Sequence, residues 1–545
     1  MPTRVTIPDE IAPRPEFHAL RPVVMSPRGV VVAGTPLAAG AGARMLAEGG
    51  AAMDAAVAAA GVQAVVMPHL NGLGGDLWLL HVSSAGAVRA LNASGPAPAG
   101  ATAEAYRARG WSGVPTRGIE AVSVPGAVDG WFRALGALGR LPASRVFEPA
   151  LEYARDGFPV HRNFVRFLAS PSFQALARQS PALATTYLRD GRLPDPGSRL
   201  VQPDLAKTFE RVVRDGPEEY YRGETAALIE RTSARHQGSL GRQDLARYES
   251  QWVEPVSVPY RGLTVYQVPP NSQGIAMLQQ LRLLDSFDLA GLRHNTAEYI
   301  HLLVESKKAA FADRGRWVAD PDRATVPIAD LLSTARAADF RARFDAHRAS
   351  DVTEPRRRRP RGDTTCVVAM DADGAAAVLI QSLFEDFGSG VWVEGGGFAL
   401  QNRMCGFTLE AGHPNELAPG KRPLHTLCCS VALRDGRLAL AYATPGGHAQ
   451  TQTLVQVLNN LTVFGMDVQE AVEAPRVTHE PGRLLVEARV PAGVRTALGR
   501  LGHPVGVLPA WSSHVGGAAA VVVHPESAVR QAGADPRRDG YAVPA

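Results

Sequence analysis

The chain has 545 residues, 45% hydrophobic and 20% charged, so it can bury a large core and lacks the composition of a disordered protein. Its formal net charge of +4 is small for this length, and basic residues cluster only at Arg356–Arg359, which argues against nucleic-acid binding. No segment approaches the roughly 20 apolar residues of a membrane span, and the N-terminus has no apolar core like that of a secretory signal. We therefore expect a cytoplasmic protein, with no nucleic-acid or membrane partner, built as one large or two closely packed domains.

In chain order, the first third predicts two alanine-rich helices separated at Gly49 and Gly50, followed by the glycine turn "GLGGD" and a strand. The middle, from about 124 to 348, predicts a mainly helical layer interrupted by the hairpin "YRGLTVYQVPP". Beyond 364, the stretches "TTCVVAMDADGAAAVLIQSLF" and "CCSVALRDGRLALAYAT" each predict two strands joined at Asp-Gly. A further strand at "GGAAAVVVHP" and two helices in "TQTLVQVLNNLTVFGMDVQEAVEAPR" complete an α/β sandwich.

The junction at Asp363 is unusual, because an arginine run closed by Pro360 and Gly362 leads directly into an apolar strand that starts at Thr364. A hydroxyl is a weak nucleophile until a base removes its proton, and the residue's own α-amino group can be that base. A chain that cuts itself between Asp363 and Thr364 would expose this amine. The alternative is an ordinary strand start with two β-branched threonines, and the local sequence alone favours that alternative.

Longer motifs favour self-cleavage before Thr364 over an ordinary strand start. The stretches "GDTTCVVAMDADGAAAVLIQSLFEDFGSGVW", "GFALQNRM", "APGKRPLHTL" and "ATPGGHAQTQTLVQ" resemble, in order and spacing, the small subunit of the γ-glutamyltranspeptidase family. Upstream, "GTPLAAGAGARMLAEGGAAMDAAVAAA", "GLGGDLWLLHV", "SVPGAVDGWFRAL" and "YRGLTVYQVPPNSQGI" resemble its large subunit. The resemblance implies a four-layer αββα N-terminal-nucleophile hydrolase made as a proenzyme. It implies a large subunit at 1–363 and a small subunit at 364–545, which could further assemble as a dimer.

The resemblance also implies roles for individual residues. Thr364 matches the nucleophile, whose hydroxyl forms a covalent ester with the acyl group while its freed α-amine acts as base. Ser382 matches a second hydroxyl residue that orients the nucleophile. Gly446 and Gly447 match a glycine pair whose backbone amides form the oxyanion hole, where the backbone must approach closely.

The residues expected to clamp a γ-glutamyl head group are largely missing. Ser94 stands where an arginine is expected, and Phe384 stands where an asparagine is expected. Cys405–Gly406 replaces an acidic pair, and His425–Thr426 replaces a pair of serines. Arg403 adjoins these positions, so the pocket could be net positive, with Phe384 as an apolar wall, and could suit an amide that bears a carboxylate. Equally open is that Arg403 pairs with an acidic neighbour and His425 belongs to a hydrogen-bond network.

Other candidate sites are weaker. His69 in "HLNG" and His479 in "HEPGR" have no second ligand at metal spacing, so we predict no metal and no organic cofactor. The four cysteines, all beyond Thr364, are expected to be small buried residues without disulfides. The sequence therefore favours a self-processing amidohydrolase that acts on a small amide other than glutathione. The alternatives are a true γ-glutamyl hydrolase or transferase, an enzyme like the cephalosporin acylases, and a catalytically silent binding scaffold.

Overall fold

Two antiparallel sheets of seven strands form the centre of the molecule, in a computed structural model that describes residues 19–352 and 363–545. The first sheet has the order β1 (Val24–Ser26), β20 (Arg530–Ala534), β19 (Ala519–Val523), β15 (Arg437–Ala443), β14 (Cys429–Arg434), β9 (Leu263–Gln267) and β8 (Val256–Tyr260). The second has the order β21 (Tyr541–Pro544), β2 (Val30–Ala33), β10 (Asp363–Met370), β11 (Ala376–Phe384), β3 (Asp76–Val82), β4 (Val88–Ala93) and β7 (Gln251–Val253).

Alternating residues explain why the second sheet lies between two apolar layers. In β2, Val31 and Ala33 face one core, whereas Val30 and Val32 face the other, because successive side chains of a strand point to opposite faces. Both sets are buried, so the strand is apolar throughout instead of alternating with polar residues. The core that contains Val30 and Val32 also contains the apolar residues of the first sheet, and the two sheets therefore pack face to face.

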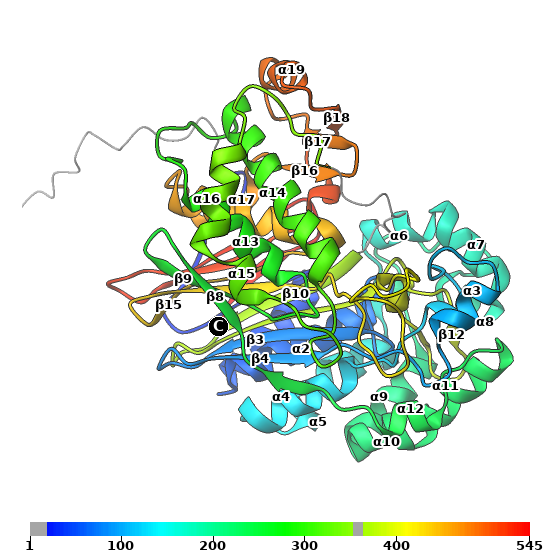
Figure 1. Ribbon diagram of the computed structural model, residues 1–545. Coiled ribbons are helices and arrows are strands. Elements are labelled where there is room, and N and C mark those ends of the chain that lie inside the picture. Colours follow the sequence, from blue (N-terminus) through cyan, green and yellow to red (C-terminus); the bar gives the residue numbers. More distant parts are fainter. Residues whose placement is uncertain (1–18, 353–362) are drawn as a thin grey trace, which may run out of the picture.

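Helices cover the outer face of each sheet, as Figure 1 shows. On the second sheet lie α1 (Pro36–Ala47), α2 (Ala52–Val66) and α4 (Ala127–Leu138), with α5 (Ala143–Asp156) packed on α2. On the first sheet lie α13 (Gly274–Asp285), α17 (Gln450–Thr462) and α18 (Val468–Glu473), with α14 (Ala297–Trp317) and α16 (Thr334–Arg343) packed on α13. The order of layers is helix, sheet, sheet, helix, which confirms the predicted αββα fold.

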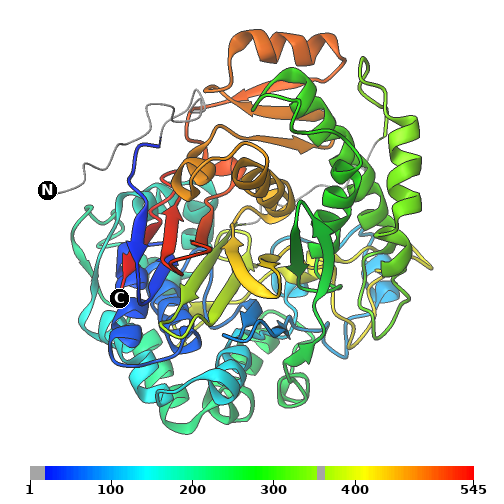
Figure 2. The same cartoon turned by 90° about the vertical axis from the view of Figure 1, so that its left-hand side faces the viewer.

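Two smaller units flank the sandwich. One is a three-stranded sheet under α19 (Ala492–Arg500), seen at the top of Figure 2, with strands β16 (Val477–Glu480), β17 (Arg483–Glu487) and β18 (Val505–Leu508). The other is a group of short helices: α3 (Ala103–Ala108), α6 (Arg162–Leu168), α7 (Pro171–Gln179), α8 (Pro181–Tyr187), α9 (Pro203–Asp215), α10 (Pro217–Arg222), α11 (Glu224–Arg235) and α12 (Arg242–Ala246). The remaining short elements are α15 (Ile328–Leu331), β5 (Phe158–Pro159), β6 (Arg199–Leu200), β12 (Trp392–Val393) and β13 (Phe398–Ala399).

The structure confirms most of the expected elements. The helices α1 and α2 are separated at Gly49, which has a φ of +88° that favours glycine, and the two strand pairs beyond 364 are β10–β11 and β14–β15. The hairpin expected in the middle of the chain is β8–β9, with β8 at the edge of the first sheet, whereas β7, at the edge of the second sheet, was not expected. The four cysteines are unpaired, and no helix within 19–352 or 363–545 is long and apolar enough to cross a membrane. The loop expected at 356–362 and the N-terminal segment lie outside the described residues.

Candidate active site

Thr364 lies near the start of β10, in the centre of the second sheet, and its side chain is buried. The pairing of β10 with β11 shifts by one residue at this point, so Ser382 and Leu383 together lie opposite Thr364. Such a bulge reorients the side chains on either side of it. Here it allows the hydroxyls of Thr364 and Ser382 to meet.

A chain of hydrogen bonds connects Thr364 to the peptide bond that precedes it. Thr364 Oγ1 donates to Ser382 Oγ at 3.2 Å, and Ser382 Oγ donates to the carbonyl oxygen of Asp363 at 2.7 Å. The backbone N–H of Phe384 donates to the same Ser382 oxygen at 2.7 Å. Ser382 therefore contacts both the hydroxyl of Thr364 and the carbonyl that this hydroxyl would attack. We call the Thr364, Ser382 and Asp363 groups the hydroxyl chain.

Phe384 joins the hydroxyl chain to a buried arginine. Its φ of +81° is rare for a bulky residue, and such strain persists only where the surroundings impose it. The guanidinium carbon of Arg403 lies 4.2 Å from the centre of the Phe384 ring, within the range of a cation–π contact. The ring also lies 6.3 Å from that of His448, edge to face. Phe384 thus contacts Ser382 through its backbone N–H and Arg403 through its ring.

Arg403 is only 1% exposed and lacks partners for two of its donor atoms. Its Nη1 donates to Thr426 Oγ1 at 2.8 Å, but Nε and Nη2 have no hydrogen-bond partner. Burial lowers the pKa of Arg403 to about 10, which still leaves the guanidinium charged at neutral pH. Unpaired buried donors are costly, so these atoms fit a site completed by a ligand. Arg403, Phe384 and Thr426 form what we call the Arg403 site.

The sequence did not reveal Asp76, a buried carboxyl beside the Arg403 site. Asp76 pairs with Ser382 in the register of β3 and β11, and a Cβ on Gly75 would lie 2.7 Å from the Ser382 carbonyl oxygen. Glycine is therefore needed where the "GLGGD" turn approaches Ser382. Burial raises the pKa of Asp76 to about 7, and the charge of Arg403 opposes this rise. The sequence signal for Asp76 is its position as the acidic residue that ends the "GLGGD" turn.

His425 contacts Asp76 and not the Thr364 hydroxyl. Its Nε2 lies 3.0 Å from Asp76 Oδ2, and its Nδ1 accepts a hydrogen bond from the N–H of Leu427. Burial lowers its pKa, so the ring is neutral and Nε2–H donates to the carboxylate. Gln401 donates to the other oxygen of Asp76 at 2.8 Å. Both ring nitrogens of His425 are thus bound within the protein.

The glycine pair follows β15, where Gly446 and Gly447 have φ values of +128° and +55°. Pro445, which precedes them, lines a cavity of about 20 Å³ together with Thr364, so the loop lies beside Thr364. Gln273 donates to the carbonyl oxygen of Gly447 at 2.9 Å. Arg314 in turn donates to Gln273 Oε1 at 2.5 Å. This support from α13 and α14 was not expected from the sequence.

Ser94, at the end of β4, is not brought to the hydroxyl chain. Its Oγ donates to Asn92 Oδ1 at 2.6 Å and accepts from Asn271 Nδ2 at 3.2 Å. Its carbonyl oxygen accepts from Arg422 Nε at 3.1 Å. Ser94 therefore belongs to a buried hydrogen-bond network at the position where the family pattern has an arginine.

The side-chain carboxylate of Asp363 binds Arg538, a residue outside the hydroxyl chain. Its Oδ1 accepts from the Thr364 N–H at 2.9 Å and from Arg538 Nη1 at 2.5 Å. Asp386 lies nearby, and burial, with the charge of Asp363 added, raises its pKa to about 7. Arg538 and Asp386 both line a cavity of about 480 Å³. The sequence analysis did not identify these two residues.

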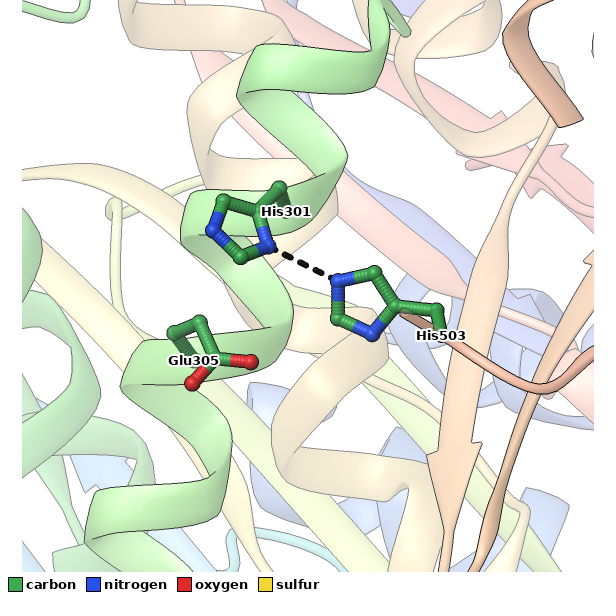
Figure 3. Close-up of side chains that lie close together, drawn as sticks. All are labelled: His301, Glu305 and His503. Atoms are coloured by element: carbon green, nitrogen blue, oxygen red, sulfur yellow. Dashed lines mark hydrogen bonds between the residues drawn. The ribbon is translucent and has the colours of Figure 1, made fainter. Parts of the chain in front are cut away.

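His301, Glu305 and His503 form a buried cluster with donor atoms of the kind that bind metals, shown in Figure 3. Their contacts describe a hydrogen-bond network. His301 Nδ1 lies 2.8 Å from His503 Nε2, and His301 Nε2 lies 2.8 Å from the Asp345 carbonyl oxygen. Glu305 accepts from Lys308 Nζ at 2.7 Å, so a divalent cation here would lie beside a buried ammonium group. The cluster joins α14 to the unit under α19.

Comparison with known proteins agrees with this geometry. The model of the γ-glutamyltranspeptidase family matches residues 38–545. The glutathione hydrolase-like YwrD proenzyme of Bacillus subtilis is 37% identical over 95% of this chain and 99% of its own length. The oxamate amidohydrolase proenzyme of Klebsiella pneumoniae is 35% identical over 95% of this chain and 99% of its own. The crystal structure of cephalosporin acylase from Bacillus halodurans superposes with a TM-score of 0.90, at 32% identity over 99% of each chain.

These findings define an N-terminal-nucleophile hydrolase. The chain belongs to the γ-glutamyltranspeptidase family, and its relatives in that family include hydrolases and amidases made as proenzymes.

Proposed function

We propose that this protein is a self-processing threonine amidohydrolase that cleaves a small, carboxylate-bearing amide and acts poorly on glutathione. The division into a large subunit at 1–363 and a small subunit at 364–545 is part of this proposal, as are a cytoplasmic location and assembly as a dimer. Four unpaired cysteines fit a reducing compartment. The single observation that carries the substrate proposal is the buried Arg403 guanidinium with two donor atoms unpartnered.

Self-cleavage would begin in the hydroxyl chain. Ser382 donates to the Asp363 carbonyl at 2.7 Å and so polarises the bond to be attacked. Thr364 Oγ1 adds to this carbonyl carbon and gives up its proton, which passes to the amide nitrogen. The C–N bond then breaks, and this nitrogen leaves as the free α-amine of Thr364. Water then hydrolyses the ester, which leaves a carboxylic acid at Asp363 and restores the hydroxyl of Thr364.

Turnover would use the same hydroxyl. The freed α-amine takes the proton of Thr364 Oγ1 as it attacks the amide carbonyl of the substrate, and Ser382 holds the hydroxyl in place. The amine half of the substrate leaves with a proton, and water releases the acid from the ester. The loop of Gly446 and Gly447 beside Thr364 would bind the oxyanion through backbone amides, and Gln273 would fix the position of that loop.

The Arg403 site supports an acidic substrate without a free α-amine. A guanidinium binds a carboxylate through two parallel N–H donors, and Nε and Nη2 of Arg403 are a suitable adjacent pair. Thr426 and Phe384 would fix this side chain, and His425 would act through Asp76. Ser94 is held by asparagines and cannot replace the arginine of a γ-glutamyl clamp. The relative named oxamate amidohydrolase also supports this class, since oxamate is a small amide with a carboxylate.

The test compares wild-type protein with Arg403→Ala and Arg403→Lys on a panel of acidic amides, their neutral counterparts and glutathione. Loss of a charge-assisted pair should lower kcat/KM on acidic amides by about 10- to 100-fold, with self-cleavage unchanged. Lysine should restore only part of the loss, because it lacks the planar pair of donors. Efficient glutathione hydrolysis by the wild type, or full activity of Arg403→Ala on its best acidic amide, would contradict the proposal.

A second candidate is an acylase that accepts a larger acyl group. The cephalosporin acylase neighbour and the relative named acylase ACY 1 from Pseudomonas sp., 35% identical over 95% of this chain and 93% of its own length, favour it. Release of a chromogenic amine from γ-glutamyl, glutaryl and succinyl anilides separates an acylase from a true γ-glutamyl hydrolase. A silent scaffold would release none of them in a Thr364-dependent way.

A further inference from the structure

Arg538 lines two cavities, and the smaller of them is also lined by Thr364. The cavity that contains Thr364 has a volume of about 20 Å³, which holds no more than one water molecule. The neighbouring cavity has a volume of about 480 Å³, enough for a small organic ligand. Met67 and Arg538 line both cavities. A substrate that reaches Thr364 through the larger cavity would therefore pass beside Arg538.

Arg538 is held in a fixed position. A Cβ on Gly517 would lie 2.6 Å from Arg538 Cδ, so the arginine stem packs directly against the backbone of this glycine. The preceding residue, Arg537, donates to Glu487 Oε2 at 2.6 Å and contacts Asp535, all with buried side chains. The loop between β20 and β21 is thus anchored, and the guanidinium of Arg538 is aimed before any ligand arrives.

The present partner of Arg538 is the side chain of Asp363. Arg538 Nη1 donates to Asp363 Oδ1 at 2.5 Å, while Arg538 Nε has no partner. In self-cleavage Asp363 supplies the acyl group, because its carbonyl carbon is the one attacked. Two carbon atoms, Cα and Cβ, separate that carbonyl from the side-chain carboxylate. Asp363 therefore resembles the acyl half of an amide made from a four-carbon dicarboxylic acid.

We propose that Arg538 binds two carboxylates in succession: that of Asp363 before self-cleavage, and afterwards the acid group on the acyl half of the substrate, seated in the larger cavity. This inference rests on the proposed function, because both need the bond between Asp363 and Thr364 to be cut. It narrows the acyl half of the substrate to a short dicarboxylic acid, for which succinate is the model. Arg403 then binds a second carboxylate, on the amine half of the substrate.

The other charges around the larger cavity are consistent with this role. Asp539 is engaged with His161 at 2.8 Å and with Asn163 at 2.7 Å, and it makes no ion pair with Arg538. Asp386 is the carboxyl that would compete for Arg538. Burial, with the charge of Asp363 added, raises its pKa to about 7, so succinate binding should be measured at a pH of about 6, where Asp386 is less ionised than at neutral pH.

The experiment uses uncut protein, so that it does not depend on self-cleavage. Thr364→Ala keeps Asp363 on Arg538, whereas the double variant Asp363→Ala/Thr364→Ala frees Arg538 without cutting the chain. Calorimetry with succinate should give at least about tenfold tighter binding to the double variant. Adding Arg538→Gln should abolish this gain. Arg166→Gln, which alters the same cavity but does not contact Asp363, should leave it in place.

Equal succinate affinity of Thr364→Ala and the double variant would overturn the inference, as would a gain that survives Arg538→Gln. Succinamide, which lacks the charge, should show no gain, and a gain equal to that of succinate would also overturn the inference. Cleavage and amidase activity of wild-type protein are measured in parallel. If both are present while the succinate gain is absent, the proposed function stands and the role of Arg538 is wrong.

Discussion

The hydroxyl chain and the Arg403 site differ in how far the protein satisfies its own polar groups. In the hydroxyl chain, Ser382 accepts from Thr364 and from a backbone N–H and donates to the Asp363 carbonyl. In the Arg403 site, two donors of a buried guanidinium have no partner. Under the proposed function, the reacting groups are already hydrogen-bonded within the chain, whereas the Arg403 donors would be satisfied by the substrate. Changes to the hydroxyl chain should therefore affect rate, and changes to the Arg403 site should affect substrate choice.

The largest effect is expected from Thr364→Ala. Without the hydroxyl, neither self-cleavage nor turnover has a nucleophile, so the chain should stay as one band and show no amidase activity. Wild-type protein should instead give fragments of roughly 39 and 19 kDa, from the proportions of the chain. Thr365→Ala is the matched control, because Thr365 lines the same small cavity and its Oγ1 has no hydrogen-bond partner. It should still be cut. An uncut wild-type chain with amidase activity would rule out the mechanism.

An intermediate effect is expected from Ser382→Ala. This change removes the group that contacts both the Thr364 hydroxyl and the scissile carbonyl, so self-cleavage should slow and kcat should fall by about 100-fold. KM should change little, because the contact matters most as the nucleophile attacks. Steady-state kinetics on the cleaved fraction, with its amount measured on a gel, checks this. An unchanged kcat would remove Ser382 from the reaction.

The smallest effect is expected from the ionisation of Asp76, whose pKa burial raises to about 7. Below this pH the carboxyl is neutral, whereas above it the charge would compete with the substrate carboxylate for Arg403. KM for an acidic amide should therefore rise several-fold as the pH increases through about 7. In Asp76→Asn this step should be absent, while the pH dependence of kcat should remain. A KM step that persists in Asp76→Asn would assign it to another group.

The same ionisation predicts a change in stability. Because the folded-state pKa of Asp76 lies above the unfolded value, the folded protein holds a proton between about pH 4 and 7 that the unfolded chain has released. Its contribution to the free energy of unfolding is therefore fully present below this window and is lost as the pH rises through it. Denaturant unfolding of Asp76→Asn should show a smaller loss of stability across this range than the wild type.

The elements around the nucleophile could be predicted because their signals are local. An Asp-Gly turn between two apolar stretches predicts β10 and β11, and the serine one hairpin along falls at 382 by its position in the motif. The register shift that lets Ser382 reach Thr364 could not be read from the sequence, since every residue of the two strands except Asp363 is buried. Periodicity does not fix register when both faces are buried.

The charged residues around the site were harder to predict, because their partners are distant in the chain. Asp76 meets His425 and Gln401 more than 300 residues away, and in the sequence it is only the end of a glycine turn. Arg538 reaches Asp363 across 175 residues from a loop with no motif of its own. These contacts arise from the tertiary packing of loops and strands far apart in the chain, which no local pattern records.

The strand order of the two sheets has a consequence for the life of the molecule after cleavage. In the second sheet β10 and β11 lie between β2 and β3, and in the first sheet β14 lies beside β9, so strands from before and after residue 363 alternate. Two cut chains interleaved in this way cannot separate without opening both sheets. Once opened, they would have to find each other again by diffusion, so recovery should depend on protein concentration, whereas an uncut Thr364→Ala chain should refold independently of it. Cleavage at this point makes the assembly of the fold an event that a single chain performs only once.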